Sequence, residues 1–167
     1  MEEQPYPPKV NEVFRWFGVA AHNAQLFEAG LLSLRLVAAA VDGQAVTEGE
    51  LRSLEAALSR KTLGQLMVVL KTRGNFSQTL EDDWARALDR RNYLIHRFFW
   101  DNAVRLYQAD GCDALACELQ ELATLFALCQ ESAQQVVEQL ITSLGVNRAE
   151  WDAAMQGELD LLFEEES

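Results

Sequence analysis

The chain has 167 residues, 14 of them Lys or Arg and 26 Asp or Glu, which gives a formal net charge of −12. A single domain usually holds roughly 100–200 residues, and a chain of this length can bury a core without metal or disulfide cross-links. The composition excludes a collagen, a disulfide-rich mini-protein and a low-complexity chain. A strongly acidic chain is also a poor non-specific binder of nucleic acid, because phosphates repel it.

Several features bear on the compartment. The longest mainly apolar stretches run to about a dozen residues, whereas a membrane-spanning helix needs roughly 18–20. The N-terminus lacks the basic-then-apolar pattern of a signal peptide. The three cysteines show no metal-type spacing, so reduced thiols are the simplest account of them. We therefore expect a cytoplasmic protein with no membrane segment, no bound metal and no cofactor.

Positive charge is concentrated in one part of the chain. Residues 60–105 hold nine of the fourteen basic residues but five acidic ones, a local net charge of +4 against −16 for the rest. A local basic patch of this kind can hold a phosphate against an acidic background. Solvated helix faces explain the same pattern equally well.

The predicted secondary structure is almost entirely helical. Prolines are confined to the first eight residues, and the remainder has few β-branched runs. The first helix is expected to begin near Lys9 or Val10, to run to about Ala40 and to end at Asp42-Gly43. Its apolar face repeats at three and four residues: Val10, Phe14, Phe17, Ala21, Ala24, Leu31 and Leu34.

Capping pairs mark the next helices. Thr47 with Glu50 predicts a short helix near 48–59, and Thr62 with Gln65 predicts one of about ten residues that ends at Gly74. A longer helix is then expected from Ser77 or Thr79 to about Ala109, ended by Asp110-Gly111. Its apolar face holds Leu80, Trp84, Leu88, Ile95 and Leu106.

A last long helix is expected over roughly 113–143. Its apolar residues alternate steps of four and three, which suits near-antiparallel packing in a bundle. Asn147 with Glu150 predicts a short terminal helix. The predicted fold is a single all-α bundle of five to six helices over residues 1–167, with a flexible N-terminus (1–8), the bundle (9–157) and an acidic tail (158–167). The apolar residues of the last long helix are Leu115, Leu119, Leu122, Phe126, Cys129, Ala133, Val136 and Leu140.

One motif carries candidate chemistry. The chain has two histidines, and His96 lies in DRRNYLIHRFFW (89–100). On a helix, Asn92 and His96 share a face, whereas Arg91 points about 140° away from His96. An imidazole can move protons to and from ribose oxygens, and a guanidinium stays charged while it binds phosphate oxygens. This combination suits RNA cleavage without a metal.

The segment RNYLIH (91–96) resembles the signature of the HEPN superfamily of all-helical domains. That signature is an Arg, four to six residues and a His, commonly with Asn, Asp or His directly after the Arg. The resemblance implies an up-and-down bundle and a metal-independent endoribonuclease with a composite site at a homodimer interface, as in toxin–antitoxin and defence systems. It implies that Arg91 and His96 are the catalytic pair and that Asn92 is their polar companion.

Neighbouring residues complete the predicted site. Arg90 and Arg97 are expected to contact the RNA backbone. Phe98, Phe99 and Trp100 predict an apolar surface for a second copy of the chain. The expected partners are therefore RNA, a homodimer and an antitoxin or another protein.

The alternative interpretation is a non-catalytic helical adaptor or regulator that binds proteins through its acidic surface and tail. It predicts a packed or isolated His96 and a salt-bridged Arg91, whereas the enzyme requires both around one open, positive cleft between two chains. Glu28 is a candidate to orient His96. His22 is interpreted as a locally bonded histidine, and the aromatic residues of 14–17 and 97–100 as core or dimer packing.

Overall fold

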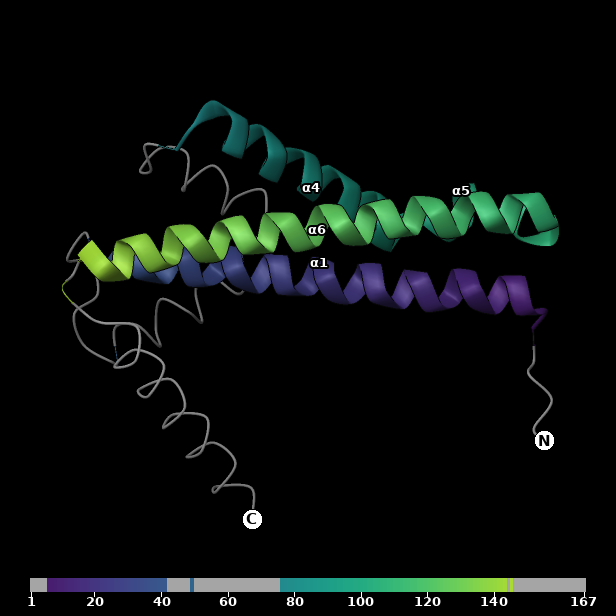
Figure 1. The fold of residues 1–167 in the computed structure, drawn as a ribbon, viewed down its shortest axis with the longest axis horizontal. Coiled ribbons are helices and arrows are strands. Elements are labelled where there is room, and N and C mark those ends of the chain that lie inside the picture. The colour runs from purple at the N-terminus through teal and green to yellow at the C-terminus, as the bar shows by residue number, and fades with distance from the viewer. Residues whose placement is uncertain (1–5, 42–48, 50–75, 144, 146–167) are drawn as a thin grey trace, which may run out of the picture.

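The computed structural model describes residues 6–41, 49, 76–143 and 145, and these residues form an all-α structure (Figure 1). It holds four α-helices and one 3₁₀-helix in place of the five to six helices predicted for the whole chain. The helices predicted at 48–59, between Thr62 and Gly74 and after Asn147, and the tail 158–167, lie outside the described residues. The elements are α1 (Pro8–Val41), α4 (Gln78–His96), α5 (Phe98–Asp101), η1 (Arg105–Tyr107) and α6 (Ala109–Ser143).

The two longest helices, α1 and α6, lie side by side along most of their lengths (Figure 1). Their contacts keep an almost constant sequence offset: Lys9 pairs with Asp113, and the Asn23 amide donates to the Ala123 carbonyl at 3.0 Å. The two helices are therefore parallel, and α4 runs in the opposite direction across them. The antiparallel packing predicted for the last helix holds against α4 but not against α1, which is its main partner.

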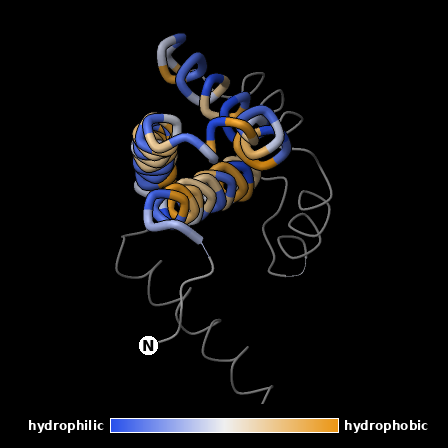
Figure 2. The backbone as a smooth tube through the Cα atoms, turned by 90° about the vertical axis from the view of Figure 1, so that its right-hand side faces the viewer, coloured by the Kyte–Doolittle hydropathy of each residue, from blue (hydrophilic) through white to orange (hydrophobic). Residues whose placement is uncertain are grey.

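The core forms between α1 and α6 and extends to the inner sides of α4 and α5. Figure 2 shows how hydrophobic and hydrophilic residues alternate along the helices. On α6 the predicted apolar series is confirmed: its first six members are buried, and Val136 and Leu140 are partly buried. On α1 the predicted face is only partly right, since Phe14 is 37% exposed. The buried residues of α1 include Val13, Ala20, Ala24, Phe27, Leu31 and Leu34.

Helix α4 begins as predicted. The Ser77 hydroxyl caps it by accepting the Leu80 N–H at 3.3 Å. Trp84 is fully buried, and its ring nitrogen donates to the Ser132 hydroxyl of α6 at 2.8 Å. This bond ties the start of α4 to the far half of α6.

The end of α4 differs from the prediction. The helix stops at His96 rather than near Ala109, because Arg97 takes a φ of −131° and leaves the helical region. The short α5, a turn and η1 follow. Ile95, which was expected on the apolar face, is 41% exposed. Asp110-Gly111 does not end a helix: it lies in the first turn of α6, where an acidic residue complements the helix dipole.

None of the helices in the described part of the chain is long and apolar enough to cross a membrane.

Candidate functional site

All five residues predicted for the site lie at the C-terminal end of α4. Arg90, Arg91, Asn92 and His96 belong to the helix, and Arg97 is its C-cap. Arg91 follows the buried Trp84 by seven residues, two helical turns, and so lies on the buried side of α4. This position turns the Arg91 side chain towards α1 and leaves it 27% exposed.

Arg91 has two bonded neighbours. Its Nε donates to Oε1 of Glu28 on α1, in an ion pair whose two side chains are 27% and 28% exposed. Its Nη1 donates to Oδ1 of Asn92 at 3.3 Å. Glu28, which the sequence suggested as a partner for His96, thus binds Arg91 instead. The arrangement holds the guanidinium in place and offsets part of its charge.

His96 is the last residue of α4, and its side chain is exposed. Within the described residues it makes no hydrogen bond or ion pair. Asn92 is also exposed and lies one turn before it. The structure therefore joins Arg91 to Asn92 and leaves the imidazole open to solvent nearby on the helix.

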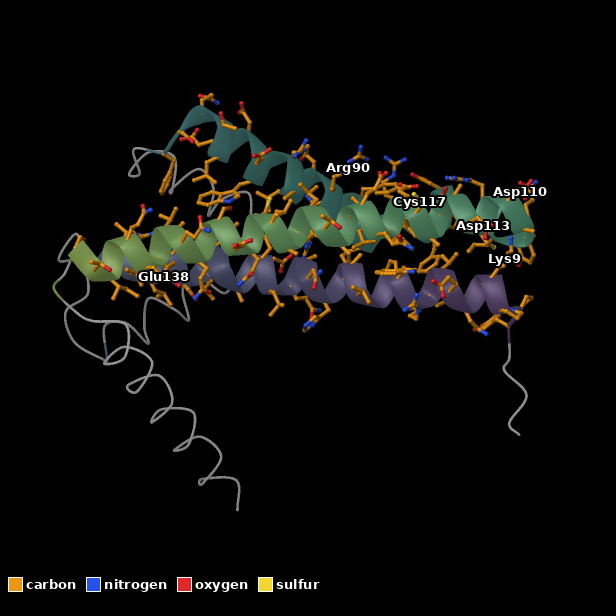
Figure 3. All side chains as sticks on the ribbon, viewed as in Figure 1. Lys9, Arg90, Asp110, Asp113, Cys117 and Glu138 are labelled. Carbon is orange, nitrogen blue, oxygen red and sulfur yellow. The ribbon has the colours of Figure 1, made fainter. Side chains whose placement is uncertain are left out.

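Arg90 lies beside a shallow cleft of about 400 Å³ between α4 and α6 (Figure 3). Arg86 lines the cleft with it, and Glu118 and Glu121 of α6 lie among the same lining residues. The two carboxylates offset the two guanidinium groups, so the cleft is mixed in charge rather than positive.

Arg97 points away from the core, and its side chain is 69% exposed. It pairs with Asp101 at 3.0 Å. An exposed pair of this kind contributes about 0–1 kcal/mol, so Arg97 can exchange it for a phosphate at little cost.

A buried polar network, which the sequence reasoning missed, supports this end of α4. The Asn102 side chain is 4% exposed, and its amide nitrogen donates to the Tyr93 hydroxyl at 2.9 Å and to the Phe98 carbonyl at 2.8 Å. Arg105 donates to the Asn102 oxygen at 2.7 Å and lies 3.7 Å from the Glu118 carboxylate of α6. Burial raises the pKa of the Tyr93 hydroxyl. An Asn inside an aromatic, otherwise helical segment was the available signal, since Asn competes with the helix by bonding to nearby backbone.

The aromatic segments divide between core and surface. Phe98 is fully buried and its ring centroid lies 5.9 Å from that of Phe17, as expected for core packing. Trp100, in contrast, is 87% exposed. A second, apolar pocket of about 610 Å³ opens beside these residues, at the start of α1. Its lining includes Tyr6, Phe14, Phe99, Leu106, Tyr107 and Cys112.

No cluster of three or more His, Cys, Asp or Glu side chains that would hold a metal occurs among the described residues. The three cysteines are free thiols, with Cys112 and Cys129 buried and Cys117 exposed.

No protein-family model, no curated protein and no solved structure matches the chain. The likeness to the HEPN superfamily therefore depends on the motif 91–96 and on its helical setting.

Proposed function

We propose that the chain is a metal-independent RNA endonuclease of the HEPN type that acts as a homodimer, as a toxin or defence component with an antitoxin or another protein as partner. His96 is the general acid/base, Arg91 the phosphate ligand and Asn92 the orienting residue. One observation carries the proposal: an imidazole open to solvent lies one turn beyond a fixed Arg91–Asn92 pair. Arg90 and Arg97 lie on the same end of α4 and supply backbone contacts.

The chemistry needs two proton transfers. The imidazole of one His96 takes the proton of a ribose 2′-OH, and the 2′-oxygen attacks the phosphorus. The bond from phosphorus to the 5′-oxygen breaks, and the His96 imidazolium of the second copy gives that oxygen a proton. The products are a 2′,3′-cyclic phosphate and a free 5′-hydroxyl.

Arg91 is suited to the developing phosphorane charge. Glu28 holds its Nε and Asn92 holds its Nη1, whereas no described residue binds its Nη2. A guanidinium fixed in this way presents the remaining N–H groups without having to be reoriented during the reaction. Glu28 is thus a positioning residue in the proposed site.

The test is cleavage of total RNA and of tRNA in EDTA by the purified full chain. We expect the wild type and His22→Ala to cleave, since His22 is an exposed histidine on α1 outside the site. His96→Ala and Arg91→Ala are expected to lose activity, by roughly 10²–10⁴-fold for the loss of the acid–base group. The His96→Ala protein should keep the wild-type melting temperature, because His96 is exposed. A folded, dimeric wild type that leaves RNA intact would overturn the proposal.

A second candidate is a non-catalytic adaptor, for which an isolated His96 and a salt-bridged Arg91 were expected. The exposed His96 side chain has no bonded partner among the described residues, and the Arg91–Glu28 ion pair occupies the arginine within one chain. The mixed charge of the cleft beside Arg90 points the same way. In this case His96→Ala changes neither the state of the RNA after incubation nor the stability of the protein. Arg91→Ala lowers the melting temperature and has no other effect. Capture of a defined protein partner that is unaffected by His96→Ala would support the adaptor.

A further inference from the structure

The connection between α4 and α6 exposes large apolar side chains to solvent. Trp100 is 87% exposed, Val104 74% and Tyr107 93%. Single exposed apolar residues are normal on a protein surface, but three within eight residues form a patch. The apolar pocket of about 610 Å³ lies against the same connection, with Phe99, Leu106 and Tyr107 in its lining. One end of the chain thus carries both a projecting indole ring and an apolar cavity.

The charge around this pocket differs from that of the chain as a whole. The two stretches that include its lining, residues 6–15 and 97–113, hold four basic and four acidic residues: Lys9, Arg15, Arg97 and Arg105 against Glu12, Asp101, Asp110 and Asp113. Lys9 pairs with Asp113, and Arg97 with Asp101. Figure 3 shows Lys9, Asp110 and Asp113 together at the end of the helix pair where α1 and α6 begin.

This local neutrality determines which occupant fits. Two copies of a chain with net charge −12 repel each other over most of their surfaces, but they meet here without that penalty. A patch that holds both signs is also self-complementary across a two-fold axis. A nucleic acid, in contrast, gains little electrostatic attraction from a surface that carries no net charge.

We propose that this end of the molecule is an isologous interface between two copies, in which Trp100 of each copy enters the apolar pocket of the other. Val104 and Tyr107 then cover the rim. In a dimer with two-fold symmetry, the indole ring of each chain is buried and the pocket of each chain is filled at the same time. Tryptophan side chains in fully desolvated pockets are often among the few residues that contribute most of the binding energy of a protein interface.

The interface deepens the proposed function, and its role in catalysis rests on that function. Helix α4 ends at His96, four residues before Trp100, so the same contact brings the His96 residues of both copies to one interface. The Arg91–Asn92 pair of each copy lies on the turn before.

The test is sedimentation velocity of the full chain over a concentration series, without RNA. We expect the wild type to be a dimer. Trp100→Glu should raise the dimer dissociation constant at least about 30-fold, which corresponds to about 2 kcal/mol. Trp100→Phe should have a smaller effect. The matched control is Leu128→Glu, because Leu128 is an exposed apolar residue (59%) on α6 outside the pocket, and its dimer should be unchanged.

Three results would overturn the interface: a monomeric wild type, a Trp100→Glu dimer of wild-type affinity, or equal weakening by Leu128→Glu. Circular dichroism of each variant separates dissociation from unfolding. RNA cleavage measured on the same samples keeps the two proposals apart. A dimer that depends on Trp100 but leaves RNA intact supports the interface and contradicts the nuclease. Full cleavage by monomeric Trp100→Glu contradicts the catalytic role of the interface.

Discussion

Arg91 is the residue of the candidate site whose environment the structure defines best. Its ion pair with Glu28 joins α4 to α1, and both side chains are less than one-third exposed. Removal of one member of such a pair leaves a charge that has lost both its partner and much of its water. The stability of this pair can therefore be measured separately from any activity.

We expect Glu28→Gln to lower the free energy of unfolding by about 1–2 kcal/mol, because Arg91 stays half-buried without its carboxylate. Urea unfolding measures the change. In a double-mutant cycle, Glu28→Ala and Arg91→Ala should show a coupling of about 0.5–2 kcal/mol. Strictly additive effects would contradict the ion pair.

The buried thiol of Cys129 is expected to make the free energy of unfolding depend on pH in the alkaline range. The side chain is 4% exposed, and burial raises the pKa of its thiol from 9.0 to about 11. In the unfolded chain the thiol ionises at lower pH than in the folded one, so proton release favours unfolding above about pH 9. The stabilisation from the neutral thiol, about 2–3 kcal/mol, is present below that pH and is lost as the pH rises towards 11.

The measurement for Cys129 is urea unfolding of the wild type and Cys129→Ala between pH 8 and 11. The variant should be less stable at pH 8, since it loses packing, and the difference should shrink as the pH rises. Cys117→Ala, at an exposed thiol, serves as the control and should follow the wild type. A constant difference across the range would contradict the burial effect.

The sequence predicted correctly how side chains on one helix point relative to each other. It did not predict which side chains of two different helices pair. The 100° rule shows that Arg91 and His96 diverge, and the structure places Arg91 inward and His96 outward. The prediction that Glu28 contacts His96 was wrong, because the register of α1 against α4 depends on tertiary packing. No pattern within either helix encodes that register.

At the scale of elements, the long helices were predictable and the connection between α4 and α6 was not. The last proline and a regular apolar series define α1 and α6 closely. Through residues 97–108 the apolar spacing continues as though the helix did not end. The buried bonds of Asn102, which stabilise the turn, involve Tyr93 of α4 and Arg105 of η1 and appear only once the chain has folded.

Asn102→Ala tests this connection. The substitution removes the side-chain bonds of the buried Asn102 amide to Tyr93, Phe98 and Arg105. We expect a loss of about 2–3 kcal/mol in the free energy of unfolding. Asn92→Ala, at an exposed amide of α4, should change it by about 0.5 kcal/mol or less. Equal effects of the two substitutions in thermal or urea unfolding would show that the network contributes little.

Two glycines form a matched pair in the long helices. A β-carbon at Gly111 would lie inside the contact distance of the Arg105 carbonyl oxygen, whereas one at Gly18 would meet no atom within 4 Å. Gly111→Ala is therefore expected to destabilise the protein by about 2 kcal/mol or more, through displacement of η1. Gly18→Ala should stabilise α1 by about 0.5–1 kcal/mol. Melting temperatures that shift in the same direction would contradict the close approach at Gly111.

At the scale of the whole molecule, the distribution of charge bears on the choice between an RNA endonuclease and a non-catalytic adaptor, since both have the same fold. The all-α class followed from composition and periodicity, but no pattern in the sequence distinguishes a catalytic arginine from a structural one. Arg90 faces carboxylates, Arg91 is paired with Glu28, and Arg97 with Asp101. An RNA-binding surface built from these residues depends on a few local phosphate contacts and not on a broad basic face.

This limited basic surface predicts a shallow salt dependence for RNA binding. If Arg90, Arg91 and Arg97 each contact one phosphate, the logarithm of the binding constant should fall against the logarithm of salt with a slope of about −2, since each contact on a single strand contributes roughly −0.7. Two protomers on one RNA give about −4. Fluorescence anisotropy with the His96→Ala protein and a single-stranded RNA measures the slope without cleavage.

Arg90→Ala should reduce the magnitude of that slope by about 0.7 for each protomer engaged. Arg15→Ala is the matched control, because Arg15 is an exposed arginine that belongs to α1 rather than α4 and pairs with Glu12 of its own helix, and the slope of this variant should be unchanged. A slope near zero would mean that the arginines of α4 do not meet phosphate, which contradicts the nuclease and leaves Arg91 a structural role. A slope lowered equally by both substitutions would place RNA elsewhere on the molecule, since a contact at the end of α4 cannot sense Arg15 and Arg90 alike.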